Sequence, residues 1–316
     1  MKDKVAILMA VYNGEKYISA QIESILKQTY QNFDLIIRDD GSKDQTVRII
    51  QTIITENPQR NIILLRNKSN IHGQLQNFSY LFDYAKNSYN FIMFSDQDDI
   101  WKENKVELSI NAIKSNNTKP TLIYTNYLNW NMEKNTRNVA YIKERHYTFE
   151  RLFVQNWTMG CTYILNKKMI DKIDHIPHGV ENHDYWIALV AALDSNIMYL
   201  PQVTMIHRLH NNNVTARSNS TSWEDRFLRL YKEVLSKNGR KGVYSRWSTV
   251  YKNLTNLYDN VKIKELYKML ISSNVKSIVL SYQYGYRAVT KKYDFVFRMY
   301  LLLKSKKEII KEIKEQ

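Results

Sequence analysis

The sequence predicts an α/β protein whose core is a mostly parallel, doubly wound sheet. Short apolar runs alternate with segments of helical periodicity through residues 1–216, and acidic residues follow two of these runs directly. The chain has 316 residues, which is enough to bury a large core and exceeds the usual size of one domain. Strands and helices that alternate at this spacing form parallel sheets with helices on both faces, and ligands bind beyond the carboxyl ends of the strands.

Four apolar runs are the predicted strands, at residues 5–11, 33–38, 62–65 and 91–94. The segments between them place apolar residues on one helical face: Ile18, Ile22, Ile25 and Leu26 in the first, Val47, Ile50 and Ile54 in the second, and Phe78, Leu81, Phe82 and Ala85 in the third. Ser42 and Gln45 have the spacing of a capping box, which predicts that the second helix begins at Ser42.

Charge divides the chain near Ala216. Residues 217–316 hold 22 Lys and Arg against 9 Asp and Glu, a net charge of +13, whereas the whole chain carries +15. Aromatic and apolar residues recur there at helical spacing, at Trp223, Phe227, Leu230, Tyr231 and Val234 and again at Phe295, Met299 and Leu302. We therefore expect an α/β domain over residues 1–216 and a basic, all-helical region over residues 217–316.

The basic region predicts an anionic partner. Amphipathic helices that interleave Lys and Arg with aromatic residues suit the surface of an anionic membrane. A solvated helical domain and a homodimer interface are the alternatives that the sequence leaves open. The single cysteine, Cys161, and the lack of an apolar run long enough to cross a bilayer indicate a cytoplasmic protein, which we expect to lie peripherally on the inner face of the cell membrane.

Missing motifs exclude other classes of protein. The sequence contains no GxGxxG and no GxxxxGK[ST], which disfavours a Rossmann dehydrogenase and a P-loop NTPase. Trp101 occupies the position where a calcium-binding EF-hand loop requires glycine. Only the isoelectric point near 9.5 favours nucleic acid, and no known nucleic-acid-binding module is visible, so no nucleic acid is expected as a partner.

Acidic clusters at the ends of two predicted strands mark a candidate site. Asp96, Asp98 and Asp99 crowd the segment 95–101, directly after the fourth strand. Carboxylates this close repel one another unless a cation lies among them, so the cluster predicts a divalent metal ion. Asp39 and Asp40 follow the second strand, where a turn with a helix cap is the alternative to a binding role.

Three motifs together resemble those of family 2 glycosyltransferases of GT-A fold. They are VAILMAVYNG at residues 5–14, IRDDGS at 37–42 and SDQDDIW at 95–101. The third is most similar to the form found in bacterial rhamnosyltransferases of surface polysaccharide synthesis. The resemblance covers roughly residues 4–216. It implies a GT-A catalytic domain that transfers a sugar, with inversion, from a nucleotide diphosphate donor and binds Mn²⁺ or Mg²⁺.

The resemblance implies roles on the donor side of the site. Asp98 is the expected metal ligand, and Asp96 is either a second ligand or a contact to the ribose. Asp39 is expected to accept a hydrogen bond from the ring N3–H that uracil and thymine share. The remaining nucleotide-binding residues are expected to be Ala10, Tyr12 and Asp40.

A segment near the end of the α/β domain resembles the family's closing motif. It implies that His210 completes the metal site and that Arg208 contacts the diphosphate. His207 stands where relatives usually carry an aromatic residue, which leaves open which of the two histidines binds the metal.

The acceptor side requires a base that removes a proton from the attacking hydroxyl. Asp184 matches the catalytic aspartate of the family, with Glu181 as the second choice and a helix cap as the alternative role for Asp184. Side chains that could contact the sugars or the acceptor are Asp99, Trp101, Trp157 and Trp186, although the tryptophans could equally belong to the core.

These residues together predict a metal-dependent, inverting glycosyltransferase. The favoured reaction moves rhamnose from a dTDP- or UDP-linked donor to a lipid-linked saccharide in the synthesis of a surface polysaccharide. Transfer of galactose, glucose or an N-acetylhexosamine is the alternative within the fold. A non-catalytic nucleic-acid- or glycan-binding protein is the alternative from another class. Spacing in the sequence does not determine the donor, the acceptor or the linkage.

Overall fold

The structure, a computed structural model, describes residues 3–141, 147–210, 228 and 231–315. Its strands are β1 (Val5–Val11), β2 (Phe33–Asp39), β3 (Ile62–Arg66), β4 (Phe91–Ser95), β5 (Ile100–Trp101), β6 (Thr121–Asn131), β7 (Thr136–Val139), β8 (Tyr163–Asn166) and β9 (Asn196–Leu209). Within the described residues they form one nine-stranded sheet in the order β3-β2-β1-β4-β8-β6-β9-β5, and β7 pairs with β6.

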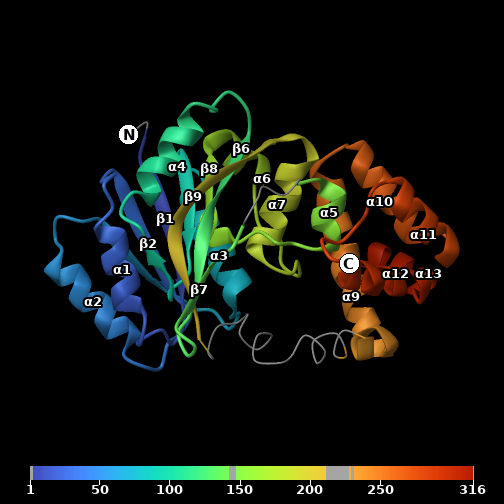
Figure 1. The fold of residues 1–316 in the computed structure, drawn as a ribbon, viewed down its shortest axis with the longest axis horizontal. Helices are drawn as coiled ribbons and strands as arrows, with labels where there is room; N and C mark the ends of the chain where they lie inside the picture. Colours follow the sequence, from blue (N-terminus) through green and yellow to red (C-terminus); the bar gives the residue numbers. More distant parts are fainter. Residues whose placement is uncertain (1–2, 142–146, 211–227, 229–230, 316) are drawn as a thin grey trace.

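Helices cover this sheet and continue beyond it. In the first 210 residues they are α1 (Ile18–Leu26), α2 (Thr46–Glu56), α3 (Gln74–Ala85), α4 (Lys105–Lys114), α5 (Phe149–Val154), α6 (Lys167–Ile173) and α7 (His183–Asp194), with a 3₁₀ turn at Gly160–Thr162. Figure 1 shows α1 and α2 at one end of the molecule and the C-terminal helices gathered at the other.

The parallel half of the sheet confirms the predicted strands. β1 pairs in parallel with β2 and β4, and β2 pairs in parallel with β3. Every residue of β2 and β4 is buried, because helices cover both faces of a parallel sheet and leave no face exposed to solvent. The predicted stripes of the first and third helices are buried as expected, including Ile18, Ile22, Phe78 and Phe82.

The predicted capping box at the second helix is wrong. α2 begins at Thr46 rather than at Ser42. The Ser42 hydroxyl instead accepts a hydrogen bond from the backbone N–H of Asn13, at 2.8 Å. The N–H of Thr46 donates to Asp44 instead, at 3.0 Å. Ser42 does not cap the helix because its hydroxyl is engaged in the contact with the loop after β1.

The second half of the sheet returns the chain to the carboxyl end of β4. β8 runs antiparallel between β4 and β6, and β9 runs parallel to β6. β5 pairs antiparallel with β9, with Ile100 opposite Ile206 and Trp101 opposite Met205. This register places the end of β9 beside the acidic segment that precedes β5, although more than a hundred residues separate them in sequence.

The described part of the C-terminal region is helical, as predicted. Its helices are α9 (Lys237–Leu257), α10 (Val261–Ile271), α11 (Asn274–Gln283), α12 (Lys291–Leu302) and α13 (Lys306–Glu315). They pack on α5, where the ring of Phe153 contacts those of Trp247 and Tyr286 at centroid distances of 5.7 and 5.8 Å. The predicted boundary at Ala216 and the predicted helical positions Trp223, Phe227 and Leu230 lie outside the described residues.

None of the helices in the described ranges combines the length and the apolar composition that a bilayer crossing requires.

Candidate active site

A cleft of about 1390 Å³ opens at the carboxyl ends of β1, β2 and β4. This is the edge at which an open α/β sheet binds ligands. Its walls come from both halves of the sheet and from the C-terminal region. They include the predicted residues Ala10, Tyr12, Asp40, Asp96, Asp98, Glu181, Asp184 and His207, together with His72, Gln97, Gly160, His183 and Tyr293.

Asp40, and not Asp39, is the carboxylate that the second strand presents to the cleft. Asp39 is fully buried, where it accepts hydrogen bonds from the N–H groups of Gly41 and Ser42 at 3.1 and 3.2 Å and pairs with Arg66 at 3.2 Å. Its carboxylate closes the turn and does not line the cleft, and the base-reading role stays a prediction.

Asp40 is held rigidly at the wall of the cleft. The N–H of Gly73 donates to its Oδ2 at 2.7 Å, and Asn67 Nδ2 donates to its Oδ1 at 2.6 Å. Gly73 makes this contact with φ at +119°, a conformation that other residues adopt only under strain. His72 lies 3.3 Å from the same carboxylate.

Gln97 fixes the loop after β1. Its Oε1 accepts from the N–H of Tyr12 at 2.9 Å, and its Nε2 donates to the carbonyl oxygen of Tyr12 at 3.1 Å. The aromatic ring of Tyr12 is half exposed and lines the cleft. Gly14 is required beneath this clamp, because a Cβ there would stand 2.5 Å from Gln97 Oε1.

Asp98 and His210 come into direct contact. Asp98 Oδ2 lies 3.1 Å from His210 Nε2, across 112 residues of sequence. The imidazole of His210 stacks on the ring of Tyr17 with centroids 4.1 Å apart, which orients it. A carboxylate and an imidazole converging in this way are a suitable ligand pair for a divalent cation.

His207 has a different partner. Its Nδ1 lies 2.8 Å from Asp99 Oδ1, and both side chains are buried. Burial lowers the pKa of His207, but the charge of Asp99 and its hydrogen bond, with smaller effects of Asp96 and Asp98, raise the pKa to about 9 overall. Asp99 is fully buried in this ion pair and does not line the cleft, and its contact with the sugar or acceptor stays a prediction.

Asp96 lies at the wall of the cleft. Burial and then the charges of Asp99 and Asp98 raise its pKa to about 8. Ligand atoms of Asp96, Asp99 and Cys161 lie within 4.8 Å of one another. The crowding that the sequence predicted is therefore present, and an added cation would relieve it.

Arg208 supports the acidic loop from behind. Its Nε donates to the carbonyl oxygen of Asp98 at 2.5 Å, and its Nη2 donates to those of Asp99 and Tyr17 at 3.1 and 3.2 Å. The side chain is buried and does not line the cleft. In this structure the guanidinium holds backbone carbonyls, and the predicted contact with the diphosphate stays a prediction.

Asp184 faces the cleft from the first turn of α7. Its Oδ1 accepts from the N–H of Tyr185 at 2.7 Å and its Oδ2 from that of Gly160 at 3.3 Å. Asn182, not Asp184, is the N-cap of the helix, so the alternative role as a cap is wrong. Burial raises the pKa of Asp184 to about 6, which is suitable for a base near neutral pH.

The predicted tryptophans belong to the packing of the protein. Trp186 is fully buried and its Nε1 donates to the carbonyl oxygen of His175 at 3.0 Å. Trp101 is buried beside the ammonium of Lys105, 4.8 Å from its ring. Trp157 packs on Tyr147 and is not part of the wall of the cleft. Stacking of a sugar on these three rings is therefore not supported.

The sequence interpretation missed several side chains of the cleft. Gln97 lies within the acidic motif and His183 lies next to Asp184, so position in a motif could have indicated both. His72 and Gly160 carry no comparable signal. Tyr293 comes from α12, in the C-terminal region, and only the tertiary structure places it here.

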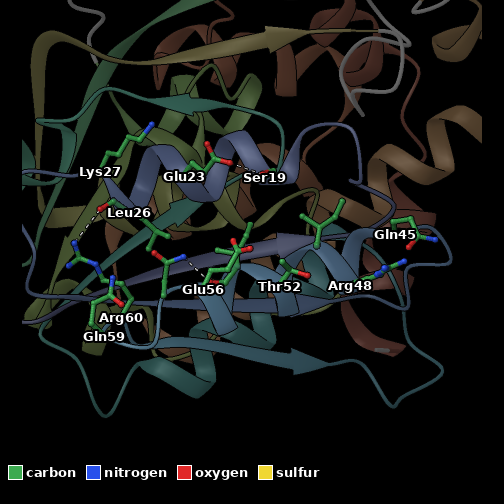
Figure 2. A pocket seen from close by; sticks show the side chains of 13 residues that line it. Ser19, Glu23, Leu26, Lys27, Gln45, Arg48, Thr52, Glu56, Gln59 and Arg60 are labelled. Atoms are coloured by element: carbon green, nitrogen blue, oxygen red, sulfur yellow. Dashed lines mark hydrogen bonds between the residues drawn. The ribbon is translucent and has the colours of Figure 1, made fainter.

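A second pocket, of about 750 Å³, lies between α1 and α2 and shares no lining residue with the cleft (Figure 2). Charges of both signs line it, from Glu23, Lys27, Arg48, Glu56 and Arg60. Figure 2 shows Glu23 turned toward Ser19, whose hydroxyl donates to it at 2.8 Å. None of the predicted functional residues lines this pocket, so the cleft is the candidate active site.

Solved structures show that the fold is of GT-A type. The structure of S. aureus TarS 1-349 in complex with UDP-GlcNAc superposes with a TM-score of 0.58 over 99% of this chain and 92% of that one, at 15% identity. The mannosyltransferase PcManGT from Pyrobaculum calidifontis, in complex with GDP-Man and Mn²⁺, gives a TM-score of 0.54 over 99% and 87%, at 12% identity. These likenesses confirm the predicted GT-A fold.

The sequence comparisons identify the family. Residues 6–173 match the model of glycosyl transferase family 2, and the chain belongs to this family. It is 34% identical over 194 residues, 61% of this chain and 71% of the relative, to the Escherichia coli UDP-Glc:alpha-D-GlcNAc-diphosphoundecaprenol beta-1,3-glucosyltransferase WfgD. It is 28% identical over 214 residues, 65% and 72%, to the Shigella flexneri dTDP-rhamnosyl transferase RfbG. The protein is thus a glycosyltransferase, which decides against the non-catalytic alternative.

Proposed function

We propose that the protein is an inverting, metal-dependent glycosyltransferase that acts in polysaccharide synthesis. One observation carries the proposal. Asp98 and Asp184 line the same cleft, and the imidazole of His210 contacts Asp98, so a carboxylate–imidazole pair that could hold a metal ion and a carboxyl of raised pKa border one space.

The metal site is proposed at Asp98 and His210, with Asp96 as a further ligand. A bound Mn²⁺ or Mg²⁺ would stabilise the negative charge that develops on the leaving nucleotide diphosphate. His207 contacts Asp99 and His210 contacts Asp98, so the choice of His210 over His207 rests on its contact with the proposed ligand Asp98. The nucleotide is proposed to lie along Ala10, Tyr12 and Asp40.

Asp184 is proposed to be the catalytic base. As the acceptor hydroxyl attacks the anomeric carbon, its proton passes to the Asp184 carboxylate. The bond from that carbon to the diphosphate oxygen breaks on the opposite face, and the configuration of the sugar is inverted. The hydrogen bonds from Tyr185 and Gly160 hold the carboxylate in place during this transfer. Glu181 also lines the cleft, but it is exposed and carries no comparable restraint.

We propose two donors in order of test. Rhamnose from dTDP-rhamnose is the donor sugar that the SDQDDIW motif favours, and the RfbG relative supports it. Glucose from UDP-glucose is the second donor to test. The WfgD relative, a UDP-Glc-dependent glucosyltransferase by name, supports it and has the higher sequence identity of the two. The proposed acceptor is a lipid-linked saccharide, for which the name of the WfgD relative provides the support.

A donor screen tests the proposal. The purified protein is incubated with Mn²⁺, a saccharide linked through diphosphate to undecaprenol, and dTDP-rhamnose, UDP-glucose, UDP-galactose or UDP-N-acetylglucosamine. We expect nucleotide diphosphate release and a longer glycan with one donor, and loss of both in Asp98→Asn and Asp184→Asn. Full turnover in either variant would remove that residue from the mechanism. The absence of turnover and of binding with every donor would overturn the proposed function.

We propose further that α11 and α12 hold the enzyme on an anionic membrane surface. Val275, Val279 and Tyr282 are exposed at helical spacing on one face of α11, and Phe295 and Leu302 are exposed on one face of α12. The net charge of +13 over residues 217–316 complements anionic lipid.

Vesicle binding tests the membrane contact. Val279→Glu should weaken co-sedimentation with phosphatidylglycerol vesicles, whereas Val261→Glu should not, because Val261 is equally exposed but lies on α10. Equal binding by the two variants, or no binding by the wild type, would refute the contact. Concentration-dependent association that Val279→Glu abolishes would instead assign this face to a homodimer.

A further inference from the structure

His183 is a buried imidazole without a hydrogen-bond partner among the described residues. It is the first residue of α7, directly before Asp184, and is 5% exposed. Neither Nδ1 nor Nε2 has a partner in the described part of the chain. Leaving a buried polar group unpaired costs about 1–3 kcal/mol, and a packed core would carry phenylalanine here at no such cost.

Aromatic side chains fix the plane of this ring. His183 stacks on Phe78 with centroids 3.9 Å apart and lies 5.2 Å from the ring of Phe94. Phe94 is near the end of β4, two residues before Asp96. His183 is one of the residues that line the cleft. The ring therefore cannot turn away to find another partner without breaking its stack on Phe78.

The backbone at Gly160 leaves room for this imidazole. A Cβ at Gly160 would stand 2.4 Å from His183 Nε2 and 3.2 Å from the Cβ of Asp184. The N–H of the same glycine donates to Asp184. Gly160 thus leaves room for the imidazole of His183 and also orients the carboxylate of Asp184. This arrangement is expected if the two side chains contact one bound molecule.

The imidazole is neutral at physiological pH. Burial lowers the pKa of His183 to about 3. A neutral imidazole offers one N–H donor and one nitrogen acceptor. Together these two groups can accept from one sugar hydroxyl and donate to another, and neither presents a charge to the diphosphate.

We propose that His183 binds a hydroxyl of the transferred sugar and so helps to select the donor. This inference rests on the proposed function. The anomeric carbon must lie within reach both of the diphosphate at Asp98 and of the acceptor hydroxyl at Asp184. The ring of His183 lies 5.2 Å from that of Phe94, two residues before Asp96, and His183 directly precedes Asp184, so we expect the ring of the transferred sugar to be the part of the substrate that meets it.

Binding measurements on His183→Phe test the inference. Phenylalanine keeps the stack on Phe78 but removes both polar nitrogens, and the free protein should melt at the same or a higher temperature. Dissociation constants are measured with Mn²⁺ for dTDP-rhamnose, UDP-glucose and UDP-N-acetylglucosamine, and for dTDP and UDP alone. We expect the sugar nucleotide that the wild type prefers to bind about tenfold more weakly, and the free nucleotides to bind unchanged.

His175→Phe is the matched control, because His175 is partly exposed and does not line the cleft. Unchanged binding and turnover in His183→Phe would overturn the inference and assign His183 to packing or to a bound water. An equal loss of affinity for free and sugar-linked nucleotide would overturn it as well. Should the Phe variant fail to fold, His183→Leu carries the same expectation. If the wild type binds none of the sugar nucleotides, the proposed function itself fails, which is a distinguishable result.

Discussion

Replacing Asp184 by asparagine should distinguish the effect of this carboxyl on the stability of the fold from its proposed effect on catalysis. Burial raises the pKa of this carboxyl from its ordinary 3.8 to about 6, so its ionised form is destabilised in the folded protein. Asparagine has nearly the same shape but no proton to lose. It can still accept the 2.7 Å hydrogen bond from Tyr185.

The magnitude follows from linkage. Because the pKa is raised in the folded state, the folded protein binds more protons than the unfolded chain between about pH 4 and pH 6. The stabilisation by the protonated carboxyl is complete below about pH 4 and is lost as the pH rises through 6. Two pKa units correspond to about 3 kcal/mol, and solvent in the cleft reduces this to roughly 1–3 kcal/mol.

Thermal unfolding and initial rates measure the two effects. The melting temperature of Asp184→Asn minus that of the wild type should increase by about 2–12 °C between pH 4 and pH 7.5, at roughly 2–4 °C per kcal/mol. The wild-type kcat/KM should rise through pH 6, and the variant should lose about 10²–10⁴-fold in kcat. A difference in melting temperature that does not change with pH would refute the raised pKa, and retained kcat would refute the role as base.

The metal pair, the glycine beside the base and the support of the acidic loop are tested separately. Asp98→Asn and His210→Ala should each abolish the increase in melting temperature that Mn²⁺ with UDP gives the wild type; an unchanged increase would exclude that ligand. Gly160→Ala should lower the free energy of unfolding by about 1–3 kcal/mol and reduce kcat, because the new methyl group would meet His183; a fully active, equally stable variant would show that the neighbours yield. Arg208→Lys keeps the charge but not the fork that reaches three carbonyls, and should lower stability by about 2 kcal/mol as judged by denaturant titration; wild-type stability with impaired diphosphate affinity would support the phosphate role.

The amino-acid sequence by itself determined the elements of the parallel half and the chemistry of the site. Strands that are buried on both faces have continuous apolar sequences. Residues 5–11 and 91–94 could therefore be recognised as strands before any contact was known. Acidic residues placed directly after such strands must lie at one edge of the sheet. For this reason Asp98 and Asp40 were found in the cleft where the sequence expected them.

The errors share a physical cause. Asp39 and Asp40 are adjacent and chemically identical. Alternation along the strand, the ion pair of Arg66 with Asp39 and the hydrogen bond from Gly73 to Asp40 decide which carboxylate closes the turn. Trp186 lies on a helix whose buried and exposed faces depend on what packs against it. Ser42 has the correct spacing for a helix cap, but its hydroxyl accepts a hydrogen bond from the N–H of Asn13 instead. In each case the side chain was identified correctly and its partner was not.

Only the tertiary structure decided how the distant segments meet. The antiparallel register of β5 against β9 brings His207 to Asp99, His210 to Asp98 and Arg208 to the carbonyls between them. A shift of one residue in that register would turn every side chain to the other face of the strand and separate these pairs. Local sequence specifies which residues can bind a cation or remove a proton. The pairing of strands more than a hundred residues apart specifies which of them do so together, because that choice depends on long-range packing that no local pattern encodes.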